Sequence, residues 1–148
     1  EQDALDRQRA LKKSLMKFWR DSGILNFLSA PVIYALVVPL ILLDVSLTLY
    51  QFICFPIYGI RKVPRSHFVV MDRHHLAYLN AVEKLNCAYC GYANGVIGYG
   101  REIASRTEER WCPIKHARRV RGVHPRYYKF DDFGDADSFR KRPEHDGG

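Results

Sequence analysis

The chain has 148 residues, a formal net charge of +7 and four cysteines. This length allows one domain with an anchor, or two small units, and leaves the polar part too small to bury a large core. The positive charge favours anionic partners: lipid headgroups, nucleic acid or an acidic protein face. Three cysteines lie in the polar part, and an odd count is atypical of a secreted disulfide framework. It suits a reduced compartment and a bound metal better.

Residues 1–23 are predicted to form an amphipathic juxtamembrane helix. Leu11, Leu15 and Phe18 recur at helical spacing, and lysine and arginine residues surround them. Because an apolar tract follows immediately, we expect this helix to lie on a membrane surface. The alternative is an ordinary helix that packs on its own protein.

Residues 24–60 form one long apolar tract, in which Asp44 is the only charged residue. A helix needs roughly 20 apolar residues to cross a bilayer, so this tract is predicted to be a membrane segment. Three arrangements remain open: a single tilted span over about 29–56, a re-entrant hairpin that bends near residues 39–44, and a helix lying at the surface. Basic residues flank both ends, so the positive-inside rule does not select an orientation.

Asp44, Thr48 and Gln51 share one face of the expected membrane helix, at positions i, i+4 and i+7. A carboxyl group inside a membrane is costly unless it is paired or faces protein. We therefore expect these three side chains to contact another membrane subunit. The alternative places Asp44 at the headgroup boundary.

The polar part, residues 61–130, is predicted to be a small helical metal-binding domain. Asp72 resembles the N-cap of a helix that runs to about residue 86, and a second helical stretch covers about 94–111. Residues 131–148 are expected to be a disordered tail. Beyond Pro113 the chain is strongly basic, and we expect three arginines to contact anionic lipid or an acidic partner: Arg118, Arg119 and Arg121.

Four residues have the spacing of metal ligands. Cys87-Ala-Tyr-Cys90-Gly has the form of a metal knuckle, and Cys112 precedes His116 by four residues, with Pro113 suited to begin a helix between them. A Cys₃His set suits tetrahedral zinc. One ion can hold all four only if the chain reverses between Cys90 and Cys112, through a glycine-rich loop that precedes a short helix over about 102–110. The rival interpretation is a long helix whose small residues pack tightly against a neighbour, with unligated thiols.

Two resemblances accompany this pattern. The Cys112-x₃-His116 spacing resembles the last ligand pair of the mitoNEET-type iron–sulfur proteins, although that family has Cys-x-Cys as its first pair and Asp-Gly after its third cysteine. That likeness implies iron or an iron–sulfur cluster as the alternative to zinc. Across about residues 24–135, the runs CAYCGYANG and WCPIKHARRV resemble a family of small proteobacterial membrane-anchored proteins. This second likeness implies a membrane anchor and the cysteine pattern, with no activity.

These observations predict a mainly α-helical protein of the bacterial inner membrane, with its polar domain in the cytoplasm. The expected function is that of a zinc-stabilised, non-catalytic accessory or scaffolding subunit of a larger membrane complex. One alternative is a membrane-bound redox protein, either an iron–sulfur carrier or a Cys-x₂-Cys thiol–disulfide exchanger. The other is a membrane-tethered nucleic-acid-binding protein that stacks bases on Tyr127 and Tyr128; nucleic acid is the less favoured partner, because charge runs usually face solvent or lipid.

Overall fold

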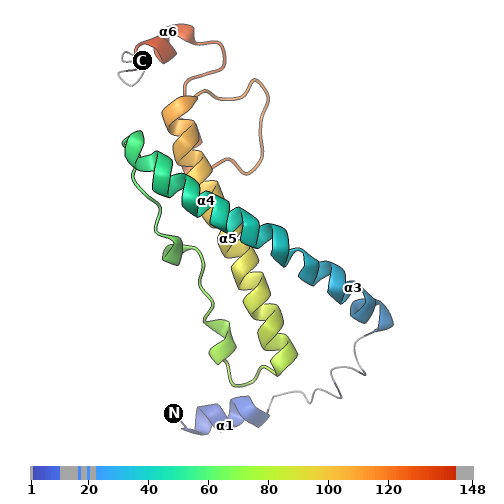
Figure 1. The fold of residues 1–148 in the computed structure, drawn as a ribbon. Helices are drawn as coiled ribbons and strands as arrows, with labels where there is room; N and C mark the ends of the chain where they lie inside the picture. The colour runs from blue at the N-terminus through green and yellow to red at the C-terminus, as the bar shows by residue number, and fades with distance from the viewer. Residues whose placement is uncertain (1, 11–16, 18–19, 21–22, 143–148) are drawn as a thin grey trace. The chain divides into compact units, whose positions relative to one another are not determined.

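The computed structural model describes residues 2–10, 17, 20 and 23–142, and the described chain is mainly helical (Figure 1). The α-helices are α1 (Gln2–Ala10), α3 (Ile24–Ala35), α4 (Val37–Ile57), α5 (Ala81–Trp111) and α6 (Ala136–Arg140). The short 3-10 helices are η1 (Arg65–His67), η2 (Arg73–His75) and η3 (Pro125–Lys129). The chain forms two compact units: unit 1 contains residues 1–45 and 64–97, and unit 2 contains residues 46–63 and 98–148.

Helix α1 confirms a helical start over residues 2–10. The residues that made the predicted helix amphipathic, Leu11, Leu15 and Phe18, lie outside the described residues.

Helices α3 and α4 follow one another with only Leu36 between them. Pro39 explains the interruption, because its ring would clash with the carbonyl of Ala35 in a continuous helix. In the first turn of α4, by contrast, its missing N–H needs no partner. Residues 39–44 are helical, so the predicted hairpin bend at this place is wrong. Together the two helices, Ile24–Ile57, are long and apolar enough to cross a membrane, and 6% of their most apolar window is buried.

The end of α4 is a Schellman motif. Gly59 has a φ of +67°, the Ile60 N–H donates to the Phe55 carbonyl (2.8 Å), and the Gly59 N–H donates to the Pro56 carbonyl (3.4 Å). The chain therefore turns away sharply after the apolar tract, and the next residues, Arg61 and Lys62, are exposed.

Helix α5 begins at Ala81, with a capping box before it. The Glu83 N–H donates to Asn80 Oδ1 and the Asn80 N–H donates to Glu83 Oε2, each at 2.9 Å. The prediction that Asp72 caps a helix running to residue 86 is therefore wrong: Asp72 precedes only the single turn η2. These two hydrogen bonds satisfy the backbone N–H groups of Asn80 and Glu83, so the long helix begins here and not at Asp72.

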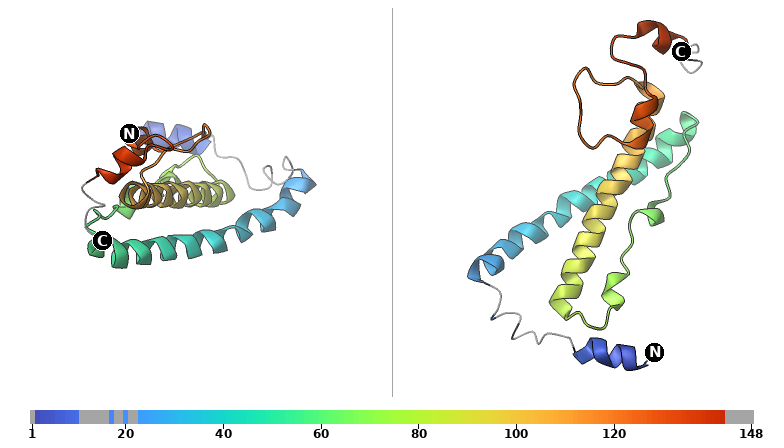
Figure 2. Two further views of the ribbon diagram at one scale, coloured as in Figure 1. Left: turned by 90° about the horizontal axis from the view of Figure 1, so that it is seen from above. Right: turned by 180° about the vertical axis from the view of Figure 1, so that it is seen from behind.

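Helix α5 is unbroken to Trp111, as both views of Figure 2 show. The predicted reversal through the glycines, with a separate helix over 102–110, is wrong. In unit 1 a Cβ added at Gly95 would lie 2.7 Å from the Phe68 carbonyl oxygen, and one at Gly91 would lie 3.2 Å from that of Val70. In unit 2 a Cβ at Gly100 would lie 2.9 Å from Leu47 Cδ1. The glycines are thus places of close packing along a continuous helix, as the rival interpretation held.

Residues 112–124, between α5 and η3, form no helix. Pro113 is buried but begins no helix; its carbonyl accepts from the Asp131 N–H (2.9 Å), and Ile114 pairs with Asp131 in an isolated bridge. The prediction of a helix starting at Pro113 is therefore wrong, because these backbone groups bond to the later segment. Within the tail expected to be disordered, α6 is a short helix capped by Asp135, and residues 143–148 lie outside the described residues.

Candidate functional site: the two faces of the apolar helix

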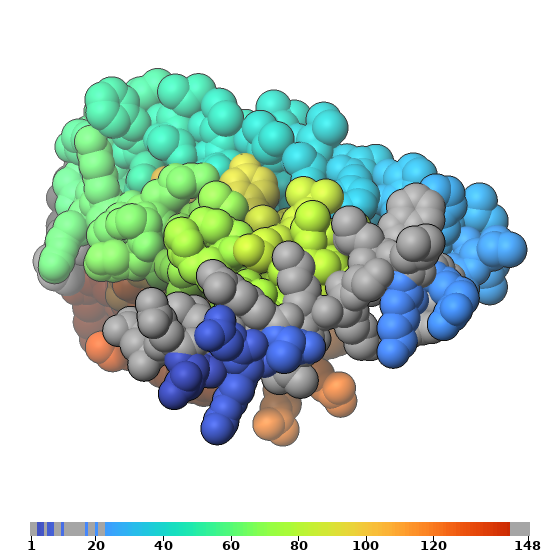
Figure 3. All heavy atoms as spheres, turned by 90° about the horizontal axis from the view of Figure 1, so that it is seen from below, coloured from blue at the N-terminus to red at the C-terminus, as the bar shows by residue number. Residues whose placement is uncertain are grey.

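Helix α4 has one face without cover from the rest of the chain, and that face is apolar. Its large side chains are 48–70% exposed, and α3 adds more of the same kind. Figure 3 shows the side chains of α3 and α4 along one edge of the view, with no other segment outside them. The exposed apolar face, as we name it, consists of Ile24, Leu25, Phe27, Leu28, Val32, Val38, Ile41, Leu42, Val45, Leu49, Phe52 and Ile53. Within α4 the positions 38, 41, 42, 45, 49, 52 and 53 follow helical spacing, so they form a continuous stripe. Contiguous apolar surface of this extent marks a contact with lipid or protein.

The opposite face of α4 is polar and covered. Asp44, Gln51 and Phe55 are buried, at spacings of seven and four residues. In unit 1 the Asp44 carboxylate accepts from Arg65 Nε (2.8 Å) and Nη2 (2.6 Å), and from the Tyr92 hydroxyl (2.9 Å). This bidentate pair with an additional hydroxyl satisfies the only acidic group of the tract.

In unit 2 the same face of α4 bonds to the turn after α4 and to α5. The Gln51 amide exchanges hydrogen bonds with the Val63 backbone at 2.9 and 3.2 Å, and also reaches the Tyr99 hydroxyl. Thr48 lies 3.3 Å from the same hydroxyl, and Tyr50 lies 3.1 Å from Thr107. The structure thus gives the predicted seam of Asp44, Thr48 and Gln51 partners within this chain. Contact with another subunit stays a prediction.

Sequence analysis missed the partners of this seam. Tyr92 and Tyr99 are seven residues apart on α5, the same interval that separates Asp44 from Gln51 on α4. Equal spacing on two helices indicates that these residues pair. The sequence gives this indication only if residues 92–99 are known to be helical.

A second charged cluster lies in unit 2 around Glu102. Its carboxylate accepts from Arg126 Nη2 (2.8 Å) and Nη1 (3.0 Å) and from Arg106 Nε (2.8 Å). Arg126 also donates to Ser105 (2.8 Å) and pairs with Glu109 (3.1 Å). The hydrogen bonds from Arg126, with those from Arg106, hold the pKa of Glu102 below its ordinary value despite partial burial. This cluster fixes η3 to the side of α5.

The predicted metal ligands are not brought together. Cys87 and Cys90 lie within α5, Cys112 follows its last residue, and His116 lies in the segment after it. With about 1.5 Å of rise per residue, an unbroken α5 separates Cys90 from its end by about 30 Å. Among the described residues, no three histidine, cysteine or acidic side chains form a group that could hold a metal. The structure therefore does not show the knuckle, and metal binding stays a prediction.

Three basic residues lie on an exposed loop between α5 and η3. Arg118, Arg119 and Arg121 are all exposed, and the Gly122 carbonyl accepts from Arg101 (2.8 Å). Of the two tyrosines considered for base stacking, Tyr128 is 74% exposed, whereas the Tyr127 hydroxyl accepts from the His116 N–H (2.7 Å). The Tyr127 ring also stacks on that of His116, with 6.0 Å between centroids. Nucleic-acid binding stays a prediction.

Comparison of the chain with models of protein families, with curated proteins and with solved structures finds no match in any of the three. The functional argument rests on the geometry above.

Proposed function

We propose that this protein is a membrane-bound, non-catalytic accessory or scaffolding subunit that lies in one leaflet, with the exposed apolar face of α3 and α4 among the acyl chains. The observation that carries this proposal is the division of α4 into an uncovered apolar face and a covered polar face. A core helix of a soluble protein is mostly buried, whereas this one is 6% buried in its most apolar window. A helix with one lipid-facing side and one protein-facing side suits an interfacial position.

Charged groups accompany α4 along its covered face, which favours an in-plane position over an upright span. In unit 1 Arg65 pairs with Asp44, and in unit 2 the part of α5 that contacts Tyr50 also carries Glu102 and Arg106. An upright span of the whole apolar helix would carry these groups into hydrocarbon, where charges are costly.

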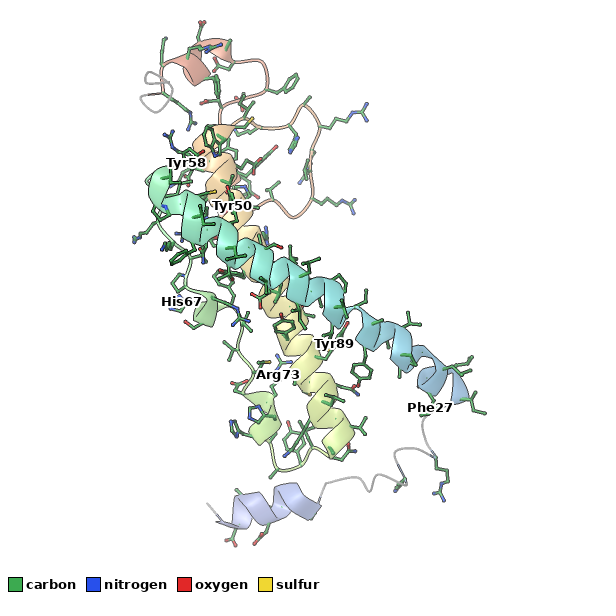
Figure 4. The ribbon with its side chains drawn as sticks, in the orientation of Figure 1. Phe27, Tyr50, Tyr58, His67, Arg73 and Tyr89 are labelled. Atoms are coloured by element: carbon green, nitrogen blue, oxygen red, sulfur yellow. The ribbon has the colours of Figure 1, made fainter. Side chains whose placement is uncertain are left out.

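A shorter upright span meets the same difficulty. Ile24–Leu43 would measure about 30 Å, the thickness of the hydrocarbon layer. Within unit 1, however, Tyr34 of α3 donates a hydrogen bond to Asn86 and makes an edge-on ring contact with Tyr89, labelled in Figure 4. The first turns of α5, with Glu83 and Lys84, would therefore follow α3 into the hydrocarbon. A position in the plane of one leaflet avoids this cost.

The polar segments supply the proposed docking role. Arg118, Arg119 and Arg121 are exposed on the loop after α5, and they would meet headgroups or an acidic face of a larger membrane complex. Zinc is no part of this proposal, because a shared site would require α5 to break. Metal analysis of the purified protein tests that prediction separately.

Depth measurement tests the in-plane position. We would replace the four native cysteines by serine, introduce single cysteines at Phe27, Leu42 and Phe52, and label them with bimane. Quenching by nitroxides at defined depths in phosphatidylcholine vesicles should place all three labels at a similar depth, about 5–10 Å into the headgroup–acyl boundary. A cysteine at Arg118 is the matched control and should report water. Absence of lipid quenching at all three sites would refute membrane binding, and a depth that changes steadily along the helix would replace the in-plane position by a span.

A further inference from the structure

The turn that ends α4 forms one side of a pocket lined by four arginines. The pocket lies in unit 2 and has a volume of about 490 Å³. Its lining comes from the turn at Tyr58–Arg61, from the last turns of α5 and from η3: Tyr58, Gly59, Ile60, Arg61, Arg106, Glu109, Arg110 and Arg126. Four of these eight residues are arginines, and Glu109 is the acidic residue among them. A concave, basic pocket of this size suits an anionic group.

The arginines are positioned by the chain itself. Arg106 donates to the carbonyl oxygens of Arg61 and Lys62, and it shares Glu102 with Arg126. These bonds fix the turn after α4 against α5, so the pocket is preformed. Arg61 is exposed and forms no side-chain ion pair with any other residue that the structure describes, so its guanidinium is available to a ligand. The planar fork of arginine matches the oxygens of a phosphate bidentately.

Aromatic side chains border the same pocket at the end of the apolar helix. Tyr58, labelled in Figure 4, lines it and contacts Trp111 edge-on at 4.8 Å between ring centroids. The two residues are 40% and 49% exposed. Lys62 lies over the Phe52 ring of the exposed apolar face at 4.3 Å. Exposed tyrosine and tryptophan beside cationic groups are typical of the headgroup level of a membrane.

We propose that this arginine pocket binds a phosphate ester, and that its ligand is the headgroup of an anionic phospholipid. The assignment to a lipid rests on the proposed membrane position, since that position brings headgroups to the end of α4. The phosphate chemistry rests on the pocket alone. A soluble phosphate is the other source of the same chemistry, and the two sources are separated by experiment.

The test uses the full chain in an uncharged maltoside detergent. A Trp19→Phe background leaves Trp111 as the only tryptophan, beside the pocket. Its fluorescence is followed while dioctanoyl phosphatidate, dioctanoyl phosphatidylcholine, glycerol 3-phosphate or inorganic phosphate is added. We expect saturable binding of phosphatidate, at least tenfold weaker binding of phosphatidylcholine, and weaker binding of the two soluble phosphates. Equal affinity for glycerol 3-phosphate would uphold the phosphate site and remove the lipid assignment.

Variants separate the pocket from general charge. Arg61→Gln and Arg110→Gln should each weaken phosphatidate binding about tenfold, whereas Arg140→Gln, an equal loss of charge on α6, should change it less than twofold. Arg61→Lys keeps the charge without the fork and should give an intermediate loss. An unchanged circular dichroism spectrum checks the fold. Equal losses for Arg61→Gln and Arg140→Gln, or no preference for phosphatidate, would overturn the proposal. Because binding is measured in micelles, this result is independent of the depth measurement in vesicles.

Discussion

The acid–arginine clusters around Asp44 in unit 1 and Glu102 in unit 2 differ in how many partners each carboxylate has. In unit 1 Asp44 relies on Arg65 and one tyrosine hydroxyl, and its side chain is 10% exposed. In unit 2 the Glu102 side chain is 22% exposed and pairs with two arginines, Arg106 and Arg126. Arg126 also has Ser105 and Glu109 as partners. Among the described residues the Asp44 carboxylate therefore has one arginine partner, whereas the Glu102 carboxylate has two. The first cluster should therefore be the more sensitive to substitution.

The largest effect is expected for Arg65→Leu, which leaves the Asp44 carboxylate covered and without its cation. Removing one partner of a covered ion pair typically costs about 3–5 kcal/mol. Asp44→Leu should cost less, because the Arg65 side chain is 43% exposed and can return to water. Denaturation in mild detergent, followed by circular dichroism, gives both free energies of unfolding.

The double variant Arg65→Leu/Asp44→Leu is the control for this comparison, and it should recover part of the loss. If Asp44→Leu costs as much as Arg65→Leu, the asymmetry inferred from exposure is wrong.

The second effect compares two glycines of α5, one in each unit. Gly95→Ala places a methyl group 2.7 Å from the Phe68 carbonyl oxygen and 2.8 Å from Val69 Cα, both backbone atoms, so it should cost about 2 kcal/mol. Gly100→Ala meets only the tip of Leu47 at 2.9 Å, which can rotate away. The higher helix propensity of alanine, about 0.5–1 kcal/mol, should offset that contact. Thermal unfolding of the two variants measures the difference, and equal destabilisation would contradict it.

The fold was predictable from sequence where the signal was local. Helical character and the apolar segment follow from composition and periodicity, and α3 and α4 confirm them. The course of α5 was not predictable from local preference, because glycine disfavours a helix when nothing else contributes. Here the close approach of residues 68–70 to Gly91 and Gly95, a contact distant in sequence, stabilises the helix that the glycines alone would weaken.

The candidate site was predictable only in part, for the same reason. Asp44, Thr48 and Gln51 were correctly placed on one face, but their partners Arg65, Tyr92 and Tyr99 lie 21 to 51 residues away in the chain. The Cys-x₂-Cys spacing predicted a reversal on ligand geometry alone, whereas the capping box at Asn80 begins one continuous helix.

The smallest effect concerns Glu102 and its dependence on pH. Arg126 and Arg106 lower the folded-state pKa of Glu102, so the unfolded chain binds a proton at this group more readily than the folded protein. The stabilisation is therefore complete above the unfolded pKa of a glutamate and is lost as the pH falls from there through the lower folded pKa. Glu102→Gln should cost about 1.5 kcal/mol at neutral pH, and the difference from the unsubstituted protein should shrink towards acid.

Asp132→Asn is the matched control for Glu102→Gln. The Asp132–Lys115 pair at 2.7 Å involves a carboxylate that is 79% exposed, so it should contribute under about 0.5 kcal/mol. A Glu102→Gln cost that is independent of pH would show that the lost contribution is packing and not charge. The arginines would then not stabilise the Glu102 carboxylate in unit 2 as Arg65 stabilises that of Asp44 in unit 1.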